Sequence, residues 1–113
     1  MSSTLKPNPA SAPTHRALTA TEIVAALAQL EGWSLRGDGA ELAIAKRYPF
    51  PDFQQAMVFA NAVAWLAQQR NHHPELTVAW GGCTVCWRTH DAGGITRTDF
   101  ACAAAVDALR EPA

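Results

Sequence analysis

Two adjacent glycines, Gly81-Gly82, separate two stretches of strand-like sequence, and this pattern constrains the fold more than any other feature of the chain. Residues 75–80 precede the glycines and residues 83–90 follow them, and in both stretches one set of alternate positions is mainly apolar. Two such stretches joined by two glycines predict a tight β-hairpin, in which Trp80 lies opposite Cys83. The chain therefore has to build an antiparallel sheet that contains this hairpin.

The rest of the predicted secondary structure surrounds this hairpin. An earlier hairpin is expected from strands at 33–36 and 41–48, because Gly37-Asp38-Gly39 between them is a strong turn signal. Apolar side chains recur at helical spacing in three further stretches. The expected helices span about 20–31, Pro51 to the residues before Pro74, and about 97–109. The predicted fold class is α+β: a four-stranded antiparallel sheet with three helices on one face, in the order α-β-β-α-β-β-α.

Length and composition indicate one domain of an ordinary globular type. The chain has 113 residues, of which 18–113 are expected to form a single domain. Residues 1–17 hold few apolar side chains among prolines, serines and threonines, so a disordered N-terminal tail is expected. The net charge of −1 favours neither nucleic acid nor an acidic membrane as a partner. No apolar run approaches the roughly 18 residues of a membrane helix, and the three cysteines suggest no disulfide framework, so a cytoplasmic protein is expected.

Histidines are the side chains that carry most of the chemical information. With a two-residue hairpin turn, strand pairing continues until position 73 lies opposite position 90. This register places His72 and His73, at the joint between the second helix and the third strand, beside His90. Because imidazole titrates at about pH 6.5, two or three histidines at one place can supply both an acid and a base.

Two other interpretations of these histidines stay open at this point. A single histidine is often a hydrogen-bonded core or capping residue, and three histidines can form a catalytic zinc site. Adjacent histidines usually diverge, and no carboxylate pattern supports the ring orientation that a zinc ligand needs, so we expect no metal. Cys83-x-x-Cys86 has the spacing of a redox or zinc motif, but we expect it to be neither, because both cysteines lie on one predicted strand. Residues three apart on a strand point to opposite faces and lie roughly 10 Å apart.

The spacing of the histidines within a longer pattern resembles a known family. The pattern is Gln68-x-x-x-His72-His73-Pro74, then five residues, Trp80, nine residues, His90, eight residues and Asp99. Together with Thr89 and Asp91 on either side of His90, it is similar to the pterin-4a-carbinolamine dehydratase family over about residues 18–109. The family usually has glutamate at the position of Gln68, so glutamine keeps the hydrogen bonding and loses the charge.

The resemblance implies a reaction and a set of site residues. The reaction is the loss of water from 4a-hydroxytetrahydropterin to give quinonoid dihydropterin. It recycles the pterin cofactor of aromatic amino acid hydroxylases. The resemblance implies that the dehydratase itself uses no cofactor. The resemblance assigns His72 and His90 to acid and base catalysis, His73, Trp80, Thr89 and Asp91 to substrate binding, and Gln68 to orienting an imidazole. Gln68 precedes His72 by one helical turn, so we expect it to face His72. Which of His72 and His90 is the acid stays open.

The resemblance also implies partners other than the pterin. Members of the family form homodimers through their sheet edges and homotetramers through the second helix. The second helix here is apolar on two sides, which independently favours a subunit contact. Some members act without catalysis, as dimerisation cofactors of a transcription factor. An interaction module of this kind is therefore the alternative function.

Overall fold

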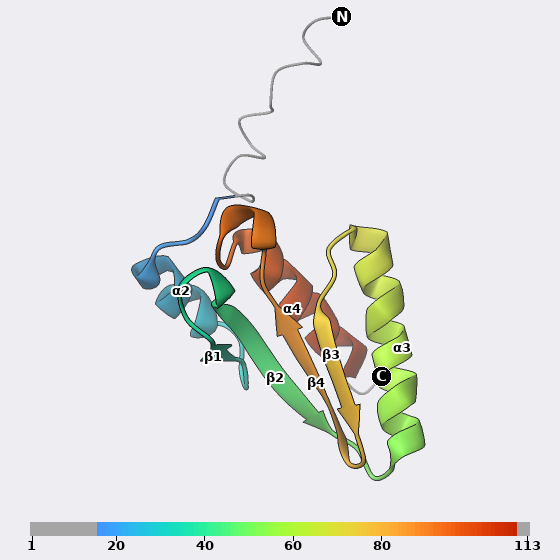
Figure 1. The fold of residues 1–113 in the computed structure, drawn as a ribbon. Coiled ribbons are helices and arrows are strands. Elements are labelled where there is room, and N and C mark those ends of the chain that lie inside the picture. Colours follow the sequence, from blue (N-terminus) through green and yellow to red (C-terminus); the bar gives the residue numbers. More distant parts are fainter. Residues whose placement is uncertain (1–15, 111–113) are drawn as a thin grey trace, which may run out of the picture.

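The computed structural model describes residues 16–110, so all but two residues of the predicted tail lie outside the described residues. The elements follow one another in the predicted order, with two short 3₁₀ helices, η2 and η3, between them (Figure 1). They are α2 (Ala20–Leu27), β1 (Ser34–Arg36), η2 (Gly39–Glu41), β2 (Ala43–Pro49), α3 (Phe53–Arg70), β3 (Glu75–Ala79), β4 (Gly82–Trp87), η3 (His90–Ala92) and α4 (Arg97–Arg110). Within residues 16–110, no helix is both long and apolar enough to span a membrane.

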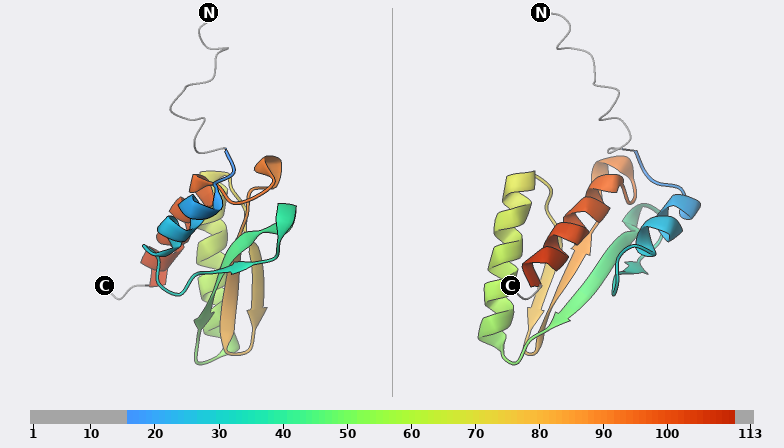
Figure 2. Two further views of the ribbon diagram at one scale, coloured as in Figure 1. Left: turned by 90° about the vertical axis from the view of Figure 1, so that its left-hand side faces the viewer. Right: turned by 180° about the vertical axis from the view of Figure 1, so that it is seen from behind.

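A four-stranded sheet forms one layer of the molecule and the helices form the other (Figure 2). The strand order is β1-β2-β4-β3, and every neighbouring pair is antiparallel. The core lies between the layers, where Ile44, Val85 and Trp87 of the sheet and Val63 and Val106 of the helices are fully buried. The predicted fold class is therefore confirmed, including the order of the elements.

Local signals explain where each helix begins and ends. Thr19 and Glu22 form the capping box at the start of α2, in which each side chain bonds the backbone N–H of the other residue. This helix ends at Leu27, earlier than the predicted residue 31, because the next hydrogen bonds span only three residues and turn the chain. Asp52 caps α3 by accepting the N–H of Gln55.

The predicted register of the second hairpin is wrong by two residues. Ala79 pairs with Gly82, so the turn residues are Trp80 and Gly81 in place of Gly81 and Gly82. Gly81 takes a left-handed backbone with φ of +90°, whereas Gly82 also pairs with Pro49 of the neighbouring strand β2 and is thereby drawn into β4. A shift of two residues leaves every side chain on its predicted face, because strand residues alternate with a period of two. Strand β4 also ends at Trp87, three residues before the predicted end.

Candidate active site

The three predicted histidines meet at one end of the sheet, where α3 and β4 both end. A cleft of about 250 Å³ lies there. Its lining residues are Asn71, His72, His73, Arg88, Thr89, His90 and Asp91. The predicted convergence of the histidines is therefore confirmed, because the two-residue register error still leaves them at the same end of the hairpin. Arg88 and Asn71 line the cleft although the sequence did not single them out as site residues.

His72 is held at its edge and at its face by two different elements. Its Nε2 atom lies 2.6 Å from Oδ1 of Asp99, near the start of α4. Its ring stacks on the indole of Trp87 from β4, with ring centroids 5.4 Å apart and planes inclined by only 10°. The imidazole is therefore fixed both in position and in plane by these two contacts.

Asp99 is a fully buried carboxylate with several donors around it. One of its oxygens, Oδ2, accepts the backbone N–H of Thr96 at 2.9 Å and the hydroxyl of Thr89 at 2.8 Å. A carboxylate in its ionised form only accepts hydrogen bonds, and in that form Nε2 of His72 is the donor to Asp99. The other ring nitrogen of His72, Nδ1, is then the atom left for chemistry in the cleft. In the sequence, Asp99 stood out only as the last member of the family pattern, and its contact with His72 was not predicted.

His73 and Gln68 form a second, looser pair. Nε2 of His73 lies 3.3 Å from Oε1 of Gln68, and both residues are exposed. Gln68 was expected to face His72, but the contact that forms is with His73. The reason is Asn71, whose left-handed backbone (φ of 52°) ends α3 and turns the two following residues away from the helical path.

Of the remaining predicted site residues, His90, Asp91 and Thr89 line the cleft, whereas Trp80 lies elsewhere. His90 and Asp91 belong to η3, are exposed and line the cleft. Thr89 also lines the cleft, but its hydroxyl bonds Asp99 and Thr96, so it supports the carboxylate that holds His72. Trp80 is 78% exposed at the turn of the β3–β4 hairpin, the end of the sheet opposite to the histidines, and is not brought together with them (Figure 1).

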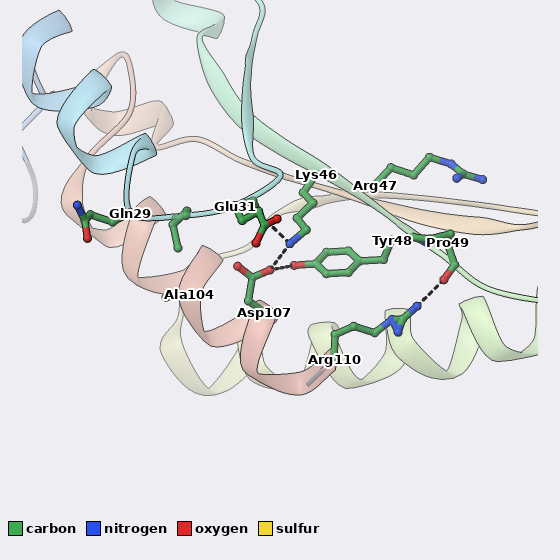
Figure 3. A pocket seen from close by; sticks show the side chains of 10 residues that line it. Gln29, Glu31, Lys46, Arg47, Tyr48, Pro49, Ala104, Asp107 and Arg110 are labelled. Atoms are coloured by element: carbon green, nitrogen blue, oxygen red, sulfur yellow. Dashed lines mark hydrogen bonds and ion pairs between the residues drawn. The ribbon is translucent and has the colours of Figure 1, made fainter. Parts of the chain in front are cut away.

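A larger cavity, of about 650 Å³, lies elsewhere, against β2 and the second half of α4 (Figure 3). Its floor is the carboxylate of Asp107, which accepts hydrogen bonds from Trp33, Lys46 and Tyr48. Burial, followed by the hydrogen bond to Asp107, raises the pKa of Tyr48 above its ordinary value, so this hydroxyl stays protonated at neutral pH. The polar groups of the floor are paired with one another and include no histidine. We therefore take the smaller histidine cleft as the candidate active site.

Comparison with known proteins agrees with the histidine pattern. Residues 16–109 match the model of the family described as pterin 4 alpha carbinolamine dehydratase. The chain belongs to this family. A family member from Paracidovorax citrulli, named as a candidate pterin-4-alpha-carbinolamine dehydratase, is 50% identical over 88% of this chain and 85% of its own length. Another from Paracoccus denitrificans, named in the same way, is 46% identical over 81% of this chain and 84% of its own length.

Two solved structures share the dehydratase fold. The crystal structure of a transcriptional coactivator/pterin dehydratase from Brucella melitensis has a TM-score of 0.77 and 31% identity, covering 85% of this chain and all of that one. A pterin dehydratase-like protein identified as a RuBisCO assembly factor in the alpha-carboxysome has a TM-score of 0.60 and 22% identity, covering 74% of this chain and 95% of that one. The second likeness concerns the fold alone.

Proposed function

We propose that this protein dehydrates 4a-hydroxytetrahydropterin to quinonoid dihydropterin. The observation that carries the proposal is the cleft in which His72, fixed by a buried carboxylate, lies together with His73 and His90. Membership of the dehydratase family supports the same reaction. The proposal includes the wider role of recycling the pterin cofactor of aromatic amino acid hydroxylases in the cytoplasm.

The reaction needs two proton transfers and no redox step. The bond between C4a and its hydroxyl oxygen breaks, and a proton delivered to that oxygen lets it leave as water. The proton on N5 is removed, and its electron pair forms the double bond between N5 and C4a. His72 and His90 are the proposed acid and base, and Nδ1 is the nitrogen through which His72 acts. Acid–base catalysis of this kind typically contributes a factor of about 10² to 10⁴.

The other cleft residues are proposed to bind the pterin. His73, supported by Gln68, and Asp91 offer polar groups at the exposed rim of the cleft. Thr89 contributes indirectly, since its hydroxyl is committed to Asp99. Trp80 has no place in this proposal within a single chain, because the length of the β3–β4 hairpin separates it from the cleft.

A second function is an interaction module that does not need the histidines. It is favoured by the apolar side chains that α3 leaves in solvent, among them Phe53, Val58 and Trp65, which are 50%, 63% and 67% exposed. The description of the Brucella relative as a transcriptional coactivator/pterin dehydratase points in the same direction. Both functions use one fold, and they differ in whether His72 and His90 are required.

The test is a dehydration assay on synthetic 4a-hydroxytetrahydropterin. We expect His72→Ala and His90→Ala each to lower the rate roughly 10²- to 10⁴-fold. The double variant should lose little more than the worse single variant, because residues that act as one unit are not additive. His15→Ala is the matched control, since His15 is the one histidine of the chain that the family pattern does not include. Full activity in both cleft variants would exclude the mechanism and favour the interaction module.

A further inference from the structure

Trp87 is buried in a way that ordinary core packing does not explain. Its side chain is fully buried, and its indole N–H has no hydrogen-bond partner among the described residues. A buried donor without a partner is destabilising, and a phenylalanine or leucine would fill much of the same space without it. The presence of an indole here therefore calls for a compensating contact.

The contact that the indole makes with its flat face is the stack on His72. The two ring planes are inclined by 10° with centroids 5.4 Å apart, which is the offset stacked geometry that aromatic pairs prefer. Asp99 holds the same imidazole only at Nε2, so that the ring could still rotate about the line through that hydrogen bond. A flat surface against one face of the ring removes this remaining rotation. The two contacts together leave Nδ1 pointing in one direction.

We propose that Trp87 is a positioning residue for His72, which sets the plane of the imidazole so that Nδ1 faces the bound pterin. This inference rests on the proposed dehydratase function and deepens it. Trp87 does not line the cleft and is fully buried, so it acts on the reaction only through His72. A proton donor or acceptor that is misplaced by about 1 Å can lose a factor of roughly 10² in rate.

Three variants separate positioning from simple loss of core packing. Trp87→Leu removes the flat face, and Trp87→Phe keeps a flat face while removing the unpartnered N–H. Val85→Ala is the matched control, because Val85 is also fully buried, on the same strand and on the same face of the sheet. Each variant is assayed at a temperature at which its circular dichroism matches that of the wild type.

The expected result is a split between kcat and KM. Trp87→Leu should lower kcat roughly 10- to 100-fold with little change in KM, Trp87→Phe should keep most of kcat, and Val85→Ala should lose stability but not kcat. A kcat for Trp87→Leu equal to that of Val85→Ala would overturn the proposal. So would an equal loss in Trp87→Leu and Trp87→Phe, since a flat ring would then restore nothing.

An NMR measurement tests the positioning without using activity. The ring protons of His72 should be shifted upfield by the indole, and the ring nitrogens should show a single tautomer with the proton on Nε2. Trp87→Leu should abolish the upfield shift, and Trp87→Phe should retain part of it. If the wild type shows these signals but no dehydratase activity, the proposed function fails and the positioning of His72 stands. Unshifted ring protons in an active wild type would overturn the positioning alone.

Discussion

Asn71 is the residue that decides how the histidine pair is presented. It is the one residue other than glycine among residues 16–110 with a positive φ, and its N–H still bonds back to the last turn of α3. The N–H of His72 reaches Ala67 in the same way, at 3.2 Å. Beyond Asn71 the chain leaves the helical path, which sends His72 toward Asp99 and leaves His73 near Gln68.

The first prediction concerns the backbone of Asn71. Asn71→Gly should keep stability close to that of the wild type, because glycine adopts the left-handed conformation without steric cost. Asn71→Ala should lower the free energy of unfolding by about 1 kcal/mol, since a Cβ without a local hydrogen bond disfavours this conformation. Urea unfolding of the two variants measures the difference. Equal stability of both variants would show that the left-handed turn is not required at residue 71.

The second prediction concerns the Gln68–His73 contact. Gln68→Ala should raise KM roughly two- to tenfold, which corresponds to one ordinary hydrogen bond, and should leave kcat unchanged because His73 is proposed to bind and not to transfer protons. Gln68→Glu keeps an acceptor at this position and should keep a KM close to that of the wild type. Steady-state kinetics of both variants provides the test. A loss of kcat in Gln68→Ala would show that residue 68 acts on His72 after all.

At the scale of elements, one side chain near the start of α4, that of Asp99, both caps the helix and holds a histidine of the cleft. Asp99 accepts the N–H of Thr96 and so satisfies a free amide at the beginning of the helix. The same carboxylate holds His72 from the end of α3 and receives the hydroxyl of Thr89 beyond β4. Three elements therefore meet on one buried carboxylate, and the cleft keeps its shape only while α4 is docked.

The third prediction follows from this junction. Asp99→Asn should lower kcat by at least tenfold, because an amide offers one acceptor where the carboxylate offers two, and a loss of stability of about 1–3 kcal/mol should accompany it. Asp52→Ala is the control, because it removes the cap of α3 for a comparable cost of about 1 kcal/mol, at the end of that helix opposite to His72. Rate assays and urea unfolding of both variants separate the effects. If both variants kept full kcat, Asp99 would be a helix cap and nothing more.

Much of the element order could be predicted because each signal is local. The alternation of apolar residues, the capping box at Thr19 and the turn glycines act within a few residues, and they gave the right sequence of helices and strands. The hairpin register was wrong because pairing with β2 decided whether Gly82 belongs to the turn or to the strand. The His72–Asp99 contact joins residues 27 positions apart, and its partner was visible only as the last member of the family pattern.

At the scale of the whole molecule, α3 has one face in the core and one face in solvent. Phe59, Ala60 and Val63 are buried against the sheet, whereas Val58 and Trp65 are largely exposed. Two large apolar side chains in solvent on one helix suggest a surface that another molecule covers. We therefore keep the proposal that the protein forms a homodimer or homotetramer.

The fourth prediction is that light scattering at micromolar concentration gives at least twice the chain mass of 12.1 kDa. Trp65→Lys should lower the apparent mass if α3 takes part in the contact, because a charge on the buried face of an interface is costly. Arg36→Lys, on the edge strand β1, keeps the charge and serves as a control for effects of expression and purification on the apparent mass. A wild type that scatters as a single chain would exclude the oligomer.

The last prediction uses the only tyrosine of the chain, Tyr48, as a reporter of the whole fold. Its ring is buried, and its hydroxyl bonds Asp107, which also accepts from Trp33 and Lys46 and so ties α4 to β2 and to the segment before β1. Burial raises the pKa of Tyr48 above its ordinary value of 10.0, and the hydrogen bond to Asp107 adds to this effect.

A folded-state pKa above the unfolded value means that the folded protein binds this proton more tightly. The stabilisation by Tyr48 is therefore complete below the unfolded value of 10.0 and falls as pH rises above it, by up to about 1.4 kcal/mol per pH unit. Tyr48→Phe should be less stable at neutral pH and should lose less stability in alkali, so that the two unfolding free energies approach each other. Burial also raises the pKa of Cys102 to about 11, but this thiol is present in both proteins and its effect cancels in the difference.

The measurements are urea unfolding of both proteins at a series of pH values above 9, and the ultraviolet absorbance of tyrosinate in the wild type, which should appear together with unfolding. Tyrosinate absorbance in a protein that is still folded, or a constant gap between the two proteins, would show that Tyr48 is not held protonated by the fold.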